Sequence, residues 1–295
     1  MRTSNARGKV PRVGLVLSGG SARGIAHVGI LSALEEHRIP IDFIVSTSYG
    51  SIVGGYYSYG YGAAELYRMI KEFKLRYVLD LSKPWKKILS AEKTVALFEK
   101  DLHGVSIESL RIPLSILAAD IRSGEMVVLE KGSLSEAMFA SSSFPGLFEP
   151  VSRDNRLLID GGILNRMLVN IAHSKGADIV IFCDVCIYTT LNRCRIARKI
   201  YRLLLRRVEK NRERLEYKLH RINIRYMIFK SLCIVLDNQH EHEQFRKSPP
   251  DFTISPSVGN VRPLQFRRVD KIYSAGREAA LSVVGEIRKK MLKLM

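Results

Sequence analysis

The stretch VGLVLSGGSARGIAHVGIL, residues 13–31, decides the fold class of this 295-residue chain. Its first five residues form a short, mostly apolar run, which is typical of a strand buried on both faces of a sheet. Small residues follow in SGGSARG, and the apolar side chains of IAHVGIL then recur at helical spacing. A strand, a glycine-rich turn and a helix in this order predict the opening unit of an α/β fold.

Apolar runs of strand length recur along the chain, and helical patterns separate several of them. The predicted strands are Val13–Leu17, Phe43–Val45, Leu114–Ala118, Met126–Leu129, Leu157–Ile159 and Ile179–Cys183. The predicted helices are Ile25–His37, Ser51–Phe73 and the stretch from Val269 to the end. This alternation predicts an α/β fold with a largely parallel sheet covered by helices on both faces, with one hairpin where a glycine-containing turn precedes Met126.

The chain is strongly basic, with 47 Lys and Arg against 29 Asp and Glu and a net charge of +18. Such a charge attracts nucleic acid or an anionic membrane face. Much of the excess lies in Arg193–Lys230, where fourteen Lys and Arg meet three Glu and apolar residues recur at helical spacing. The segment contains no nucleic-acid recognition motif, so nucleic acid is the less favoured partner.

A basic amphipathic helix of this kind is typical of a membrane surface. We therefore predict contact with anionic lipid through four of its arginines: Arg198, Arg202, Arg206 and Arg207. The alternative is that the apolar stripe packs on the α/β domain or on a second subunit, which leaves a homo-oligomer open. We expect a tail over residues 1–10 and one domain over residues 11–295, with a basic insertion over 193–248 and a return to the α/β pattern over 250–295.

No stretch of about eighteen uncharged apolar residues is present, so we expect no membrane span. Four cysteines are too few for a disulfide framework in a chain of this length. We expect a cytoplasmic protein, and peripheral attachment to the inner membrane face is a further hypothesis.

Three short segments carry residues suited to chemistry. The loop Ser18–Gly24 has glycines at positions 19, 20 and 24, a spacing that fits neither a dinucleotide fingerprint nor a Walker loop. In FIVSTSYGSIVGG, residues 43–55, Ser48 follows an apolar strand and precedes a helix, the context of a nucleophile elbow. Asp160 follows the apolar run RLLI and precedes two glycines, which predicts a carboxylate at the carboxyl edge of the sheet.

Taken in order, SGGSARG, STSYG, ASSSFPGLFEPV and DGGILN resemble the landmarks of the patatin-like phospholipase family. That family has a G-G-G-x-[R/K]-G oxyanion loop, a G-x-S-x-G serine, a proline-containing segment and a D-G-[G/A] aspartate. The resemblance covers roughly residues 11–185 and resumes over about the last forty. It implies a three-layer α/β/α fold and a serine lipid acyl hydrolase acting on phospholipid or lysophospholipid.

The resemblance further implies a dyad of Ser48 as nucleophile and Asp160 as base, without histidine, metal or cofactor. It assigns the oxyanion loop to Gly19, Gly20, Ser21 and Arg23, and the crowded positions of the elbow to Ser46 and Gly50. Two substitutions depart from the family pattern, because Ser21 and Ser46 each stand where a glycine is usual. We expect activity to survive both substitutions, since serine is small, and we expect the ring of Tyr49 to narrow the acyl pocket.

Two other functions compete with hydrolysis. A catalytically weak or inactive protein on the same scaffold would bind a membrane or a polyanion through its basic helix. A nucleotide-binding enzyme is disfavoured by the glycine spacing of the loop. Dependence of activity on the hydroxyl of Ser48 separates the enzyme from the binding protein.

Overall fold

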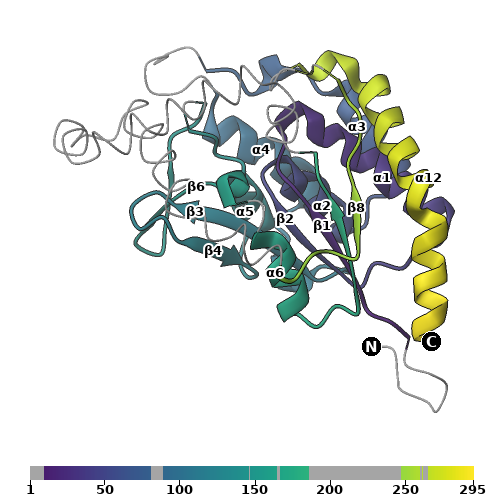
Figure 1. Cartoon of the computed structure of the whole chain (residues 1–295). Helices are drawn as coiled ribbons and strands as arrows, with labels where there is room; N and C mark the ends of the chain where they lie inside the picture. Colours follow the sequence, from purple (N-terminus) through teal and green to yellow (C-terminus); the bar gives the residue numbers. More distant parts are fainter. Residues whose placement is uncertain are drawn as a thin grey trace, which may run out of the picture.

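The computed structural model describes residues 10–80, 89–145, 147–164, 167–185, 247–259, 261 and 265–295. Within these residues one sheet contains eight strands in the order β5-β6-β3-β2-β1-β7-β8, with β4 also paired to β3. The strands are β1 Val13–Leu17, β2 Phe43–Thr47, β3 Leu114–Asp120, β4 Met126–Leu129, β5 Val151–Arg153, β6 Arg156–Asp160, β7 Ile179–Cys183 and β8 Phe252–Ile254. Figure 1 shows the sheet at the centre of the molecule.

Helices and short 3₁₀ turns connect the strands. The α-helices are α1 Ile25–Glu36, α2 Tyr49–Tyr59, α3 Ala63–Glu72, α4 Ala91–Leu102, α5 Leu134–Ser141, α6 Met167–Ser174 and α12 Val269–Leu294. The 3₁₀ turns are η1 Ser21–Gly24, η2 Leu75–Tyr77, η3 Ile107–Ser109, η4 Gly161–Leu164 and η6 Phe266–Arg268. The C-terminal helix α12 lies beside α1 (Figure 1).

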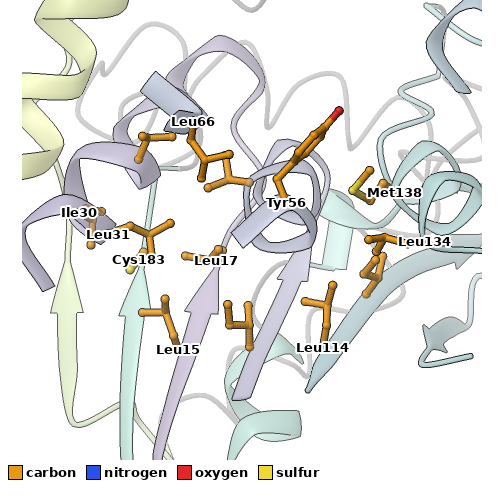
Figure 2. Packing of buried hydrophobic residues seen from close by; sticks show 14 of the residues in the cluster. Leu15, Leu17, Ile30, Leu31, Tyr56, Leu66, Leu114, Leu134, Met138 and Cys183 are labelled. Carbon is orange, nitrogen blue, oxygen red and sulfur yellow. The ribbon is translucent and has the colours of Figure 1, made fainter. Parts of the chain in front are cut away.

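Helices cover both faces of the sheet, as predicted. Leu15 and Leu17 of β1 belong to the larger core, and Figure 2 shows them in one cluster with Ile30 and Leu31 of α1. Between them Val16 points to the opposite face, where the core includes residues of α6. Side chains alternate along a strand, so a run that is apolar at consecutive positions supplies two cores. The prediction of a three-layer α/β/α fold is confirmed.

Part of the sheet is parallel and part is antiparallel. Strands β3, β2, β1, β7 and β8 are joined by four parallel pairings. The remaining pairings, of β4 and β6 with β3 and of β5 with β6, are antiparallel. The predicted hairpin is confirmed, because β4 folds back on β3 across a turn that contains Gly124.

One expectation about an individual element was wrong, and one strand was not predicted. The predicted helix Ser51–Phe73 is two helices, α2 and α3, because Gly60 takes φ +137°, a backbone angle that ends a helix. The short strand β5 was not predicted, since three residues are too few for a period to show. It returns into β6 through Asp154 and Asn155, both at positive φ, as a tight hairpin requires.

The register of β3 determines where two other strands end. Ile116 and Leu117 pair with both β2 and β4, whereas Ala118 pairs with both β4 and β6. Because a strand has two edges, β2 and β6 must share one edge of β3 and β4 must occupy the other. On the shared edge β2 ends opposite Leu117 and β6 ends opposite Ala118, so the two strands approach each other end to end.

Candidate active site

Ser48 lies in a strained turn between β2 and α2. Its backbone angles are φ +54° and ψ −132°, a region that residues with a side chain rarely adopt. Two residues later a Cβ on Gly50 would lie 2.5 Å from the carbonyl oxygen of Leu17, so the backbones have no room for a side chain there. The turn therefore has the sharpness and the crowding expected of a nucleophile elbow.

The hydroxyl of Ser48 donates a hydrogen bond to a buried carboxylate. Its Oγ lies 2.6 Å from Oδ2 of Asp160, and the backbone N–H of Gly162 donates to Oδ1 across 2.7 Å. Burial raises the pKa of Asp160 to about 6, against the opposing effect of the two hydrogen bonds. The carboxylate is thus ionised at neutral pH and in contact with the serine hydroxyl.

Asp160 lies beside the carboxyl end of β2, at the edge of the sheet that the sequence predicts, although its own strand β6 runs antiparallel to β3. It reaches Ser48 because β6 meets the end of β2 on the shared edge of β3, which makes residues 112 positions apart in the chain neighbours.

Ser141, at the end of α5, holds the elbow and was not singled out from the sequence. Its Oγ accepts the backbone N–H of Ser48 across 2.9 Å and donates to the carbonyl of Leu117 across 2.5 Å. Two residues on, the carbonyl of Ser143 accepts the backbone N–H of Asp160 across 3.0 Å. The serine-rich run in ASSSFPG thus contacts both Ser48 and Asp160. No pattern in the local sequence indicates these contacts.

The loop after β1 lies beside Ser48. Gly19, Gly20 and Ser21 line the same cavity as the serine, and a Cβ on Gly20 would lie 2.7 Å from the carbonyl oxygen of Val185. Ser21 adopts φ +50°, the left-handed conformation for which glycine is usual. The left-handed conformation of Ser21 therefore destabilises the folded state by roughly 1 kcal/mol or more relative to glycine at this position.

Arg23 and His27 form hydrogen bonds to the backbone in and beside this loop. The guanidinium of Arg23 is buried, and its Nε donates to the carbonyl of Val185 across 3.1 Å. Nε2 of His27 lies 2.8 Å from the carbonyl oxygen of Ser18. Burial lowers the pKa of His27 to about 4, so the ring is neutral and donates this hydrogen bond. The histidine anchors the start of the loop and does not reach Ser48 as a base.

A cavity of about 1120 Å³ extends from the pair. Ser48 and Asp160 line it together with Tyr49, whose ring stands beside that of Phe266 at a centroid distance of 6.0 Å. Most other lining side chains are apolar, among them Ile52, Val53, Met69, Ile70, Leu97, Phe98, Leu147 and Phe148. A cavity of this size and lining suits a long hydrocarbon group.

Ser46, the other unusual residue of the elbow, is fully buried in β2, and within the described part of the chain its Oγ has no hydrogen-bond partner. A buried hydroxyl without a partner destabilises the folded state. We expect Ser46→Ala to raise the free energy of unfolding by about 1 kcal/mol, measured by urea denaturation. A loss of stability would show that the hydroxyl has a partner after all.

Three further points concern metal ions, membrane-spanning helices and the basic segment. Over the ranges that the structure describes, no group of three or more His, Cys, Asp and Glu is arranged to hold a metal ion. No helix among the described residues is both long enough and apolar enough to cross a membrane. The segment Arg193–Lys230, with Arg198, Arg202, Arg206 and Arg207, lies outside the described residues, so its membrane contact stays a prediction.

Comparison with known proteins identifies the family to which this chain belongs. A family model described as patatin-like phospholipase matches residues 15–173. "Lysophospholipase NTE1" of Candida albicans is 29% identical over 287 residues, which cover 94% of this chain and 20% of that protein. "Patatin-like phospholipase domain-containing protein 6" of Mus musculus is 29% identical over 299 residues, 95% of this chain and 21% of that protein. The chain thus spans about a fifth of the length of these relatives.

A shorter relative and a solved structure extend the comparison. The "Uncharacterized NTE family protein Mb1092c" of Mycobacterium bovis is 37% identical over 174 residues, 58% of this chain and 48% of that protein. The crystal structure of VipD from Legionella pneumophila aligns with a TM-score of 0.49 and 13% identity, over 94% of this chain and 67% of that chain. The family match covers more than half of the residues and includes both Ser48 and Asp160, so the chain belongs to the patatin-like phospholipase family.

Proposed function

We propose that this protein hydrolyses lipid esters, with Ser48 as the nucleophile and Asp160 as the general base. The observation that carries the proposal is the 2.6 Å hydrogen bond from the serine hydroxyl to the buried carboxylate. A base in contact with a nucleophile, beside a cavity that can hold the acyl chain, is the arrangement that acyl transfer requires.

In the first half of the reaction, Oγ of Ser48 attacks the ester carbonyl carbon while its proton passes to Asp160. The carbonyl oxygen becomes negative, and backbone N–H groups of the loop Gly19–Ser21 stabilise it by hydrogen bonds. When the tetrahedral intermediate collapses, the bond to the leaving alcohol breaks and Asp160 returns the proton to that oxygen. The product is an acyl ester of Ser48.

In the second half, Asp160 accepts a proton from a water molecule that attacks the acyl carbon. The bond to Oγ then breaks, the fatty acid leaves and Ser48 recovers its proton from the carboxyl group. One carboxylate suffices for both halves, because it accepts and returns one proton in each.

The substrate proposed is a phospholipid or a lysophospholipid. The apolar lining of the cavity suits an acyl chain, and a relative that aligns with 94% of this chain is named a lysophospholipase. The competing binding protein on the same scaffold would not depend on the hydroxyl of Ser48. A fluorophosphonate probe, which labels activated serines, separates the two functions.

The labelled protein should carry the probe on Ser48 when its peptides are analysed by mass spectrometry. Ser48→Ala should remain unlabelled, whereas Ser58→Ala, which removes another buried hydroxyl from the adjacent helix, should be labelled like the parent protein. A parent protein that resists the probe, or that carries it on another serine, would contradict the proposal.

The pH dependence of hydrolysis provides a separate test of Asp160. Because burial raises the pKa of this carboxyl to about 6, the group is protonated below that pH and cannot accept the proton of Ser48. We expect kcat/KM for a soluble ester to fall about tenfold for each pH unit below 6. Returning the enzyme to pH 7.5 should restore the rate, which excludes irreversible denaturation, and an unchanged circular dichroism spectrum at pH 5 should exclude reversible unfolding. Full activity at pH 5 would show that Asp160 is not the base.

A further inference from the structure

The cavity that holds Ser48 opens to solvent beside two exposed aromatic side chains. Tyr77 is 46% exposed and Phe144 is 54% exposed, and both line the cavity. The other large apolar side chains exposed among the described residues are Val10, Val128, Leu292, Leu294 and Met295. All of these except Val128 lie at the two ends of the described chain. Aromatic groups left in water at the opening of an apolar cavity indicate an interaction surface.

The segments that supply the two rings are joined to each other. The backbone N–H of Leu89 donates to the carbonyl of Leu147 across 3.1 Å, and Leu89 also forms an antiparallel bridge with Leu79. The next residue, Ser90, donates its N–H to the carbonyl of Val78 across 2.8 Å. The residues after Tyr77 and those after Phe144 therefore flank the same short piece of chain, and the exposed rings belong to one opening.

Positive charge borders this opening. Phe73 and Phe266 line the cavity and their rings meet edge to face at 5.6 Å, which brings η2 and η6 together. Exposed basic residues lie within or beside these two turns, and we call them the rim cations: Lys74, Arg76, Arg267 and Arg268. The exposed carboxylate of Glu72 also lines the cavity, so the five side chains carry a net charge of +3.

We propose that this opening docks on an anionic lipid surface, with Tyr77 and Phe144 in the headgroup boundary and the rim cations against the anionic headgroups. Tyrosine favours the boundary between water and hydrocarbon, phenylalanine inserts on the apolar side of that boundary, and an anionic leaflet attracts nearby Lys and Arg. The guanidinium of Arg76 lies 5.7 Å from the centre of the Tyr77 ring. These two adjacent residues can therefore supply both an aromatic contact and a cationic contact with the lipid.

Docking in this orientation gives the cavity a direct supply of substrate. An acyl chain could pass from the lipid layer into the apolar cavity between the aromatic side chains without crossing water, which removes the unfavourable hydration of the chain. This inference rests on the proposed hydrolysis of lipid esters. It is separate from the prediction for Arg193–Lys230, because it concerns other residues.

Vesicle binding by a charge-reversed protein tests the rim cations. The parent and the variant K74E/R76E/R267E/R268E are both prepared with Ser48→Ala, so that binding is measured without hydrolysis. At low salt the parent should sediment with phosphatidylglycerol vesicles and should ignore phosphatidylcholine vesicles. The rim variant should bind phosphatidylglycerol at least about a hundredfold more weakly, since each cation contributes roughly a fivefold factor near an anionic surface.

A matched control reverses the same number of exposed cations elsewhere on the molecule: R122E/K131E/R156E/K293E. This control should keep most of the binding, because net charge alone does not direct the opening toward the lipid. Equal losses in the two variants, an unchanged rim variant, or a parent that ignores phosphatidylglycerol would each overturn the proposal. The rim variant with Ser48 intact should hydrolyse a soluble ester at the parental rate, so a failure of docking is distinguishable from a failure of the proposed function.

The aromatic contact is tested by fluorescence. The sequence contains one tryptophan, Trp85, so replacing it with phenylalanine and introducing Phe144→Trp places a single fluorophore at the opening. Its emission should shift to shorter wavelength when phosphatidylglycerol vesicles are added. Val128→Trp in the same background marks the exposed apolar position away from the cavity and should not shift. No shift at position 144, or an equal shift at position 128, would overturn insertion of the opening.

Discussion

Asp160→Asn is expected to reduce kcat/KM for a soluble ester by a factor of about 10²–10⁴. Asparagine preserves the size of the side chain but cannot accept the proton of Ser48 as the carboxylate does. Ser48→Ala is expected to reduce the rate further, to the level of buffer, because no acyl intermediate can form. Initial rates with a p-nitrophenyl ester of a short fatty acid measure both effects.

The control for this experiment is Asp120→Asn. Asp120 is also buried, at the end of the neighbouring strand β3, but its carboxylate accepts hydrogen bonds from Arg122, Ser123 and Leu157 and does not line the cavity. The substitution should lower stability and leave kcat/KM close to the parental value. If Asp160→Asn and Asp120→Asn reduced the rate equally, Asp160 would have only a structural role.

Gly276→Ala is expected to destabilise the fold by at least about 2 kcal/mol. Gly276 of α12 packs on the backbone of α1, where a Cβ would overlap the carbonyl oxygen of Ala26 and lie 2.8 Å from its carbonyl carbon. Gly29 of α1 meets the backbone of α12 in the same way near Tyr273. Neither backbone can move without separating two long helices, so the added methyl group cannot be accommodated locally.

Gly285→Ala in the same helix provides the matched control. Gly285 is exposed, and a Cβ there would meet nothing within 4 Å. Alanine favours a helix over glycine by about 0.8–1.0 kcal/mol, so this variant should be more stable than the parent. Urea denaturation followed by circular dichroism gives both changes as shifts of the midpoint. Destabilisation of similar size in both variants would show that the close crossing is not the cause.

Much of the fold was accessible from local patterns. The limits of β1 and β7 agree with the apolar runs, because strands buried on both faces are apolar at nearly every position. The limits of β4 also agree, although Val128 on this strand is exposed. The first and last helices were accessible for a similar reason, since their apolar residues recur with helical spacing. The break at Gly60 was missed because glycine is tolerated inside helices, and only its positive φ ends one.

The candidate site, too, was accessible from local sequence patterns only in part. That Ser48 and Asp160 each come directly after a short run rich in apolar residues is a property of the sequence by itself, as is the run of small residues that a sharp turn needs. Their roles rested on the resemblance of four ordered motifs, because no local pattern relates residues 112 positions apart.

The tertiary structure alone decided how the pair meets. Whether β6 lies parallel or antiparallel to β3, and at which residue it ends, depends on hydrogen bonds between strands and on the hairpin with β5. The same holds for Ser141, whose hydroxyl reaches Ser48 only once α5 has packed beside β3. Local sequence determines which residues are apolar and where the chain can turn, whereas register arises from contacts between distant segments, so the geometry of the site exists only in the folded chain.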